Sequence, residues 1–249
     1  GCLNGMKLNL DLKSGSLKTD IKSLSKAASQ DIVPELMKRV NQIIKNFGPS
    51  IFKTKMPKNI LDYLNNHTDK LLNDQDAQKK YDHGNNLAGD VTQEFLLDNE
   101  VIKNSEWINF LSLCVKKWIE VETGQKIKKF HLIKTWIVRQ FKNEYNPTHW
   151  HGGHISGAGF LKVPKNFGEY KQRKFDKRNP GGHLQLIHGS KMFLCHSTLT
   201  IKPEVGDFYF FPNYLMHTVF PFKETNDERR SISFNAYKEE RIYNVYGNN

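Results

Sequence analysis

The first half of the chain carries apolar residues at helical spacing, and this pattern predicts three helices. The first lies within residues 33–47, with Pro34 in its first turn, and it ends at Gly48-Pro49. The second begins near Pro57, and the third runs from about residue 105 to Gly124. Their apolar stripes consist of Val33, Leu36, Met37, Val40, Ile44 and Phe47, then Ile60, Leu61, Leu64 and Leu71, and then Trp107, Leu111, Cys114, Val115, Trp118 and Ile119.

After residue 130 the pattern changes to short runs with β-strand character, bounded by Gly, Pro and Asn. These runs cover residues 131–141, 149–163, 183–187, 193–201, 207–211, 217–220 and 231–237. Short strands with regular turn residues between them favour a sandwich or a jelly roll. Because the helices come first and the strands after, the predicted fold class is α+β, with the helices buttressing one sheet.

This order divides the 249-residue chain into three segments. Residues 1–28 are rich in Lys, Ser and Gly and are expected to form an irregular basic arm. Residues 29–130 are expected to form a helical support region and residues 131–249 the β-strand core, with 29–249 folding as one domain. No apolar run approaches the roughly 18 residues of a membrane helix, and no secretory signal is visible. Three scattered cysteines (Cys2, Cys114 and Cys195) make no disulfide framework, which favours a reducing, cytoplasmic location.

The chain is strongly basic, with 37 Lys and Arg against 26 Asp and Glu and a formal net charge of +11. Such an excess can indicate a surface for nucleic acid. No stripe of alternating basic and aromatic residues stands out, however, and Lys, Asn and Ile are abundant throughout. A basic rim around a site for an anionic cosubstrate would produce the same excess, so nucleic acid is kept among the alternative partners only.

The most informative chemistry lies at three histidines and one arginine. His149 and His151 are two positions apart, so on a strand their side chains project to the same face. His217, from a distant strand, could complete a three-point site on one metal ion with coordination positions left open, as in non-haem Fe(II) oxygenases. Arg229 follows shortly after His217, and a fixed cation there suits a carboxylate cosubstrate.

Several ordered segments carry a resemblance to a known family. They are 146–151 (NPTHWH), 156–164 (SGAGFLKVP), 181–184 (GGHL), 203–208 (PEVGDF), 211–219 (FPNYLMHTV) and 229–235 (RRSISFN). Over about residues 133–237 the chain resembles the 2-oxoglutarate/Fe(II)-dependent oxygenases of the prolyl-hydroxylase-like branch, and it is most similar to uncharacterised bacterial and marine-phage members. The resemblance implies a double-stranded β-helix, or jelly roll, that uses Fe(II) and 2-oxoglutarate.

The resemblance also implies roles for individual residues. His149 corresponds to the first metal ligand, His217 to the distal ligand, and Arg229 to the residue that binds the far carboxylate of 2-oxoglutarate. Ser231 lies two positions after Arg229, on the same face of its strand, and could add a hydroxyl hydrogen bond. Arg230 is expected to point to the opposite face, although a one-residue bulge would exchange the two arginines.

The chain departs from the family at His151, where the family usually has Asp or Glu. One interpretation is an all-histidine site of His149, His151 and His217. A second makes His151 the first ligand, with Gly153 in the carboxylate position, as in halogenating relatives. In the third, His149 or His151 only forms a hydrogen bond to a ligand. His154 could replace a ligand, whereas His183, His188 and the pair Cys195-His196 are expected to be structural.

The function expected from these features is a dioxygenase that uses 2-oxoglutarate and O2 to hydroxylate a C–H bond, with release of succinate and CO2. A peptide or protein residue is the first expectation for the primary substrate, and a small molecule is the next. The alternatives are a cupin-like metal-binding protein without 2-oxoglutarate turnover, a three-histidine thiol dioxygenase, a halogenase, and an oxygenase acting on nucleic acid. If the chain is encoded by a virus, the host cytoplasm is its expected location.

Overall fold

The computed structural model describes residues 9–11, 16–18, 48–168 and 179–238 of the chain. The chain divides into two compact units, Gly1–Phe47 and Gly48–Asn249. In the first unit, β1 (Asn9–Asp11) pairs antiparallel with β2 (Ser16–Lys18), a pair that the expectation of an irregular arm omitted. The helix expected within residues 33–47 lies outside the described residues.

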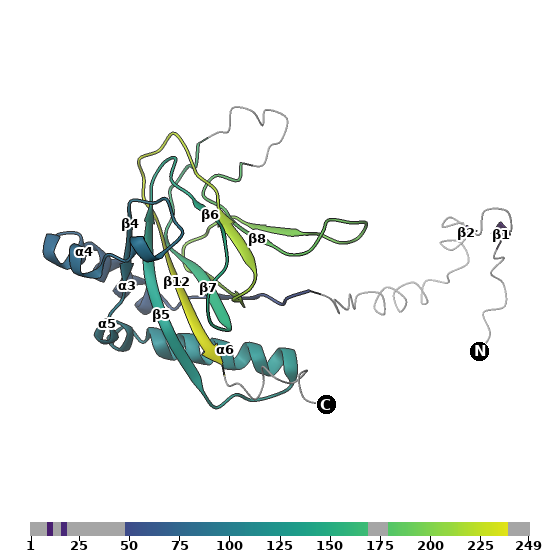
Figure 1. Cartoon of the computed structure of the whole chain (residues 1–249), viewed down its shortest axis with the longest axis horizontal. Coiled ribbons are helices and arrows are strands. Elements are labelled where there is room, and N and C mark those ends of the chain that lie inside the picture. Colours follow the sequence, from purple (N-terminus) through teal and green to yellow (C-terminus); the bar gives the residue numbers. More distant parts are fainter. Residues whose placement is uncertain (1–8, 12–15, 19–47, 169–178, 239–249) are drawn as a thin grey trace, which may run out of the picture. The chain divides into compact units, whose positions relative to one another are not determined.

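Among its described residues, the second unit contains the other two predicted helices and three shorter ones, and the longer helices can be followed in Figure 1. Helix α3 (Lys58–Leu71) begins after Pro57, as predicted, and buries Ile60, Leu64 and Leu71. The predicted third helix is α6 (Trp107–Thr123), which ends at Gly124 because that residue adopts a left-handed conformation with φ 68°. The shorter helices are α4 (Gln75–Tyr81), η1 (Gly84–Asn86) and α5 (Asn99–Asn104).

The described strands of the second unit form two antiparallel sheets. The six-stranded sheet has the order β3-β10-β7-β12-β5-β4 and the four-stranded sheet has the order β6-β11-β8-β9. The strands of the larger sheet are β3 (Phe52–Lys55), β4 (Gln93–Leu96), β5 (Phe130–Gln140), β7 (Ile155–Lys162), β10 (Asp207–Pro212) and β12 (Arg229–Lys238). Those of the smaller sheet are β6 (Asn146–His149), β8 (Leu184–Ile187), β9 (Thr198–Ile201) and β11 (Met216–Val219).

The two faces of the six-stranded sheet serve different cores. One face packs against α3, α5 and α6, and α6 runs across the strands at this face (Figure 1). The other face packs against the four-stranded sheet through Phe160, Tyr209 and Phe211 on one side and Leu184, Leu186 and Val219 on the other. Alternation along β12 follows from this arrangement: Ile232 and Phe234 belong to the helical core, while Arg229 and Ser231 line the space between the sheets.

Two glycines on β7 let the aromatic layer approach the sheet backbone. A Cβ atom on Gly157 would lie 2.6 Å from Phe234 Cε1 and 2.7 Å from Phe208 Cε1. A Cβ on Gly159 would overlap the ring of Phe208. The rings of Phe208 and Phe234 therefore fill the volume that side chains at these two positions would need.

The predicted order of helices before strands holds only in part, because β3 and β4 lie in the predicted helical region and pair with strands β10 and β5 of the core. The mixed class and the antiparallel strands are confirmed. One predicted strand, at 149–163, is instead two strands, β6 and β7, separated by a bend at residues 152–154. Within the described ranges, no helix combines the length and apolar character needed to cross a membrane.

Candidate active site

The structure brings His149, His151 and His217 together, and we call these three residues the histidine cluster. His149 is the last residue of β6, and it pairs directly with His217 on β11. His151 lies beyond the end of β6, so the argument that both histidines project from one strand is wrong for this residue. It is held instead by Asn213: the His151 N–H donates to the Asn213 carbonyl at 3.1 Å, and Asn213 Nδ2 donates back to the His151 carbonyl at 3.0 Å.

The imidazole rings turn their nitrogen atoms toward one another. One ligand nitrogen from each ring lies within 4.8 Å of the others, and the Nε2 atoms of His151 and His217 are 2.9 Å apart. His149 Nδ1 faces the Pro147 carbonyl at 2.6 Å, and His217 Nδ1 faces the Leu215 carbonyl at 2.9 Å. A carbonyl only accepts, so each Nδ1 carries the proton and each Nε2 presents a lone pair to the space between the rings.

Burial keeps these imidazoles in the neutral form that binds metals. Burial first, and then the proximity of His149, lower the pKa of His217 to about 4. For His151, burial, the other two histidines and Lys134 lower the pKa to about 2. Burial also lowers the pKa of His149. Three uncharged nitrogen donors facing one point are a suitable set for a divalent transition metal.

A polar pair lies behind His151. Asn235 Nδ2 is 3.5 Å from His151 Nδ1, and Ser156 Oγ donates to Asn235 Oδ1 at 2.8 Å. Both Asn235 and Ser156 are buried. An N–H of Asn235 donating to Nδ1 would leave the His151 proton on Nε2, so metal binding through Nε2 requires the other orientation of the amide, in which Oδ1 accepts from His151 Nδ1–H.

Arg229 is a buried cation in the same cavity as the histidine cluster. Its side chain is 2% exposed, Nε donates to the Gly182 carbonyl at 2.8 Å, and Nη1 donates to Ser231 Oγ at 3.2 Å. No carboxylate of the described residues forms an ion pair with it, and burial lowers its pKa to about 9. A guanidinium left without a counter-charge in a cavity is a binding site for an anion.

Arg230 points the other way, as the alternation along β12 predicts. It bonds to Glu228 at 2.7 Å, to Asp69 of α3 at 2.7 Å, and to Asn65. Its charge is therefore balanced on the helical side of the sheet. The predicted register is correct at both positions, because Arg229 and Ser231 share the cavity face and Arg230 does not.

Reasoning from the sequence missed Glu94, which the structure places in the cavity of the histidine cluster. Glu94 lies on β4 opposite Val138 of β5, and it is 3% exposed. Its position depends on the pairing of an edge strand with β5, which is a long-range contact. The sequence signal that could have found it is a lone acid within the short, otherwise strand-like run QEFL.

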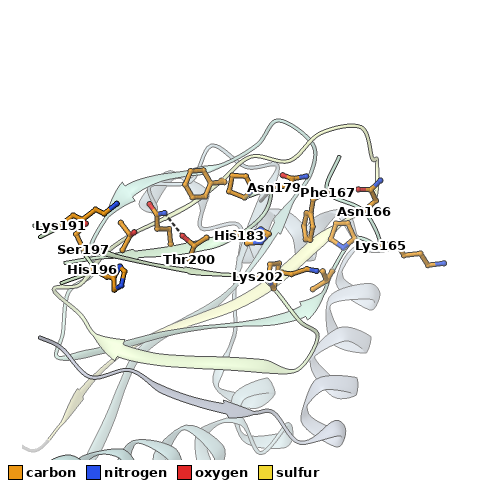
Figure 2. A pocket seen from close by; sticks show the side chains of 17 residues that line it. Lys165, Asn166, Phe167, Asn179, His183, Lys191, His196, Ser197, Thr200 and Lys202 are labelled. Carbon is orange, nitrogen blue, oxygen red and sulfur yellow. Dashed lines mark hydrogen bonds between the residues drawn. The ribbon is translucent and has the colours of Figure 1, made fainter. Parts of the chain in front are cut away.

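The remaining histidines of interest lie elsewhere. His154 packs against Tyr237, with the ring centroids 5.1 Å apart, and is not part of the cluster. His183 and His196 line a separate cavity of about 990 Å³, together with Lys165, Lys191 and Lys202 (Figure 2). Within the described part of the chain, no acidic residue lines this second cavity. The charge of this second cavity therefore comes from its lysines, and its histidines are not part of the histidine cluster.

Residues 134–235 match the model of the family described as "Putative 2OG-Fe(II) oxygenase". Over this segment the chain is similar to the 2OG-Fe(II) oxygenases. It contains the histidine cluster, Arg229 and Ser231, and the cofactors of the enzyme are the two that the family description names, Fe(II) and 2-oxoglutarate. Among curated proteins, none matches the chain.

Solved structures of the oxygenase class share the fold. A prolyl-4-hydroxylase from Pseudomonas putida matches with a TM-score of 0.50 and 14% identity, over 80% of this chain and 98% of that chain. The non-heme alpha ketoglutarate dependent epimerase SnoN from nogalamycin biosynthesis matches with a TM-score of 0.50 and 14% identity, over 82% of this chain and 83% of that one. At this identity the likeness concerns the fold, and the site must be argued from its own residues.

Proposed function

We propose that the protein is a 2-oxoglutarate- and Fe(II)-dependent dioxygenase that hydroxylates a C–H bond, using O2 and releasing succinate and CO2. The observation that carries this proposal is the combination of three converging histidines with an uncompensated cation, Arg229, in one cavity. A metal-binding protein without turnover has little use for a buried cation beside the metal. An anionic cosubstrate gives that cation a partner.

In this proposal the side chains of the chain have separate tasks. His149, His151 and His217 hold Fe(II), which when bound with 2-oxoglutarate would supply the oxidative chemistry. Arg229 binds the far carboxylate of 2-oxoglutarate through its free N–H donors, and the Ser231 hydroxyl, 3.2 Å from Arg229 Nη1, adds a hydrogen bond. The apolar side chains that line the cavity exclude water from the space between Arg229 and the metal-binding histidines. They include Trp136, Leu184 and Phe211.

We also propose that the two sheets form a double-stranded β-helix with the helices buttressing its larger sheet. The packing of the six-stranded sheet against both α6 and the four-stranded sheet supports this view. The metal ligands then come from β6, the bend after it, and β11, all at one end of the smaller sheet. The cosubstrate residues come from β12, on the facing sheet.

A peptide or protein residue is the proposed primary substrate. A cavity of about 390 Å³ opens beside His149 and His151, and it is lined also by Lys134, Trp150 and Tyr237. Trp150 and Tyr237 are 65% and 48% exposed, so they offer flat apolar surfaces at the mouth of the site. A cavity of this size accommodates one side chain of a longer molecule, and the likeness to a prolyl-4-hydroxylase favours the same substrate class.

The test is anaerobic addition of Fe(II) and 2-oxoglutarate to the purified protein. We expect a visible metal-to-ligand charge-transfer band for the unaltered protein and no band for His217→Ala. Peptide libraries can then be screened by succinate formation and by the mass increase of one oxygen atom. Tight iron binding without the band, at saturating 2-oxoglutarate, would contradict the proposed cosubstrate and would favour a metal site that works without it.

A further inference from the structure

Glu94 is a buried carboxyl group with no assigned role in the oxygenase site. Among the described residues it is the one acid that lines the cavity of the histidine cluster. Its Oε2 atom has no hydrogen-bond partner, although the residue is only 3% exposed. A buried carboxyl without a partner is costly, so such a group calls for an explanation in the chemistry of the cavity.

The surroundings of Glu94 bring the pKa of its carboxyl group close to neutral pH. Burial is the main cause, and with the nearby Asp82 it raises the pKa of Glu94 to about 7, while Lys134 acts in the opposite direction. Gly89 contributes to the burial, because a Cβ atom there would lie 3.0 Å from Glu94 Oε1 and would overlap Asn146 Oδ1. A small increase in positive charge within the cavity would therefore ionise Glu94 at neutral pH.

A divalent metal bound by the histidine cluster would create such an increase in positive charge. A site of two histidines and one carboxylate places a negative charge directly on the metal, whereas three neutral histidines leave the metal with its full double charge. The dianion of 2-oxoglutarate and the cation of Arg229 do not restore the balance, because together they leave one positive charge in excess. An ionised Glu94 would bring the sum of these formal charges to zero.

We propose that Glu94 supplies, from outside the coordination set, the negative charge that His151 does not. Glu94 releases its proton when a divalent metal binds the histidine cluster, and the resulting carboxylate strengthens the binding. This inference rests on the proposed metal site. Because the two events are linked, protonation of Glu94 weakens metal binding to the same extent that metal binding favours loss of the proton.

The first test compares Glu94→Gln with the unaltered protein in titrations with Co(II) alone, followed by visible absorption at pH 8. Gln keeps the size and polarity of the side chain and removes the charge. We expect affinity to fall by about tenfold or more, because a charge in a poorly solvated cavity is weakly screened. The matched control is Asp82→Asn, which removes one charge from an exposed neighbour that does not line the cavity, and its affinity should stay within about twofold.

The second test measures the proton release that accompanies metal binding. Calorimetric titration with Co(II) in buffers of different ionisation enthalpy counts the protons released. At pH 7, where Glu94 is about half protonated, the unaltered protein should release about half a proton more than Glu94→Gln. Near pH 8.5 this difference should disappear, because Glu94 is already ionised before the metal binds.

The outcomes separate this inference from the proposed function. Equal affinity and equal proton release for Glu94→Gln and the unaltered protein would overturn the role of Glu94 while leaving the metal site intact. An equal loss of Co(II) affinity in Asp82→Asn would also overturn the role of Glu94, because any nearby negative charge would then have the same effect. The addition of His151→Asp to Glu94→Gln should restore affinity by placing the charge on the metal itself. Identical Co(II) binding by the unaltered protein and His217→Ala would remove the metal site and both proposals.

Discussion

Neighbouring arginines on β12 should give opposite results when each is replaced by Met. Arg229 is buried without a counter-charge, whereas Arg230 is 1% exposed and bonds to Glu228 and Asp69. Met fills a comparable volume and carries no charge. We therefore expect Arg229→Met to lose cosubstrate binding without loss of stability, and Arg230→Met to lose stability without loss of cosubstrate binding.

The magnitudes follow from the environment of each side chain. The lowering of the Arg229 pKa from 12.5 to about 9 by burial corresponds to an unfavourable free energy on the order of 5 kcal/mol. Arg229→Met removes this cost and also two hydrogen bonds, so a net stabilisation of about 1–3 kcal/mol, or about 2–12 °C in Tm, is expected. Arg230→Met leaves the buried Glu228 with fewer partners and should destabilise the fold by about 3 kcal/mol.

The effect on 2-oxoglutarate should be equally distinct. A charge-assisted hydrogen bond contributes about 1.5–3 kcal/mol, so Arg229→Met should raise the dissociation constant by about 10- to 150-fold. Arg230→Met should leave it within about threefold, because the guanidinium lies on the other side of the sheet. Calorimetric titration of the Co(II)-loaded protein with 2-oxoglutarate gives the affinity, and differential scanning calorimetry gives Tm. If Arg229→Met instead lowered Tm and bound 2-oxoglutarate normally, Arg229 would be a structural residue and the cosubstrate assignment would be wrong.

Three further results are expected. His217→Ala and His149→Ala should each abolish stoichiometric iron binding while keeping the circular dichroism of the fold. His154→Ala, a control from the bend after β6, should keep its iron. Tight iron binding by all three variants would refute the histidine cluster as the metal site. His151→Asp should retain iron if His151 occupies the usual carboxylate position, whereas complete loss measured by metal analysis would favour His151 as the first ligand. Burial alone would raise the pKa of Glu228, but hydrogen bonds from Arg230 and Arg139 hold it below its ordinary value. The stability from this group is present above the unfolded pKa and is lost as pH falls through the folded one, so urea denaturation should show a smaller loss between pH 7 and pH 3 for Glu228→Gln.

Local sequence patterns were sufficient to predict features that depend on a single helix or strand. The stripe of Ile60, Leu64 and Leu71 predicted α3 because a helix needs only its own spacing to define a face. Strand alternation likewise placed Arg229 and Ser231 on one face of β12 and Arg230 on the other. Both predictions needed no knowledge of the neighbouring elements.

Predictions failed where the outcome depends on a distant partner. His151 was expected on a strand, but it lies after β6 and is held by hydrogen bonds with Asn213, which is 62 residues away. The edge strands β3 and β4 have four residues each, too few for a clear alternation, and they form through pairing with β10 and β5. Glu94 enters the cavity only through that pairing, so the run QEFL could mark a lone acid on a short strand but not its place in the cavity.

The two glycines on β7 constrain how the protein can diverge. Gly157 and Gly159 have no side chain to reduce, and the rings of Phe208 and Phe234 occupy the space beside them. At Gly159 a larger residue requires a smaller one in place of Phe208, whereas at Gly157 a Cβ atom would also lie 2.8 Å from the Tyr209 carbonyl oxygen, a contact that no smaller residue at an aromatic position relieves. In any library selected for folding, substitutions of Gly159 should therefore appear as compensated pairs, such as Gly→Ala with Phe→Leu at Phe208, and Gly157 should stay glycine.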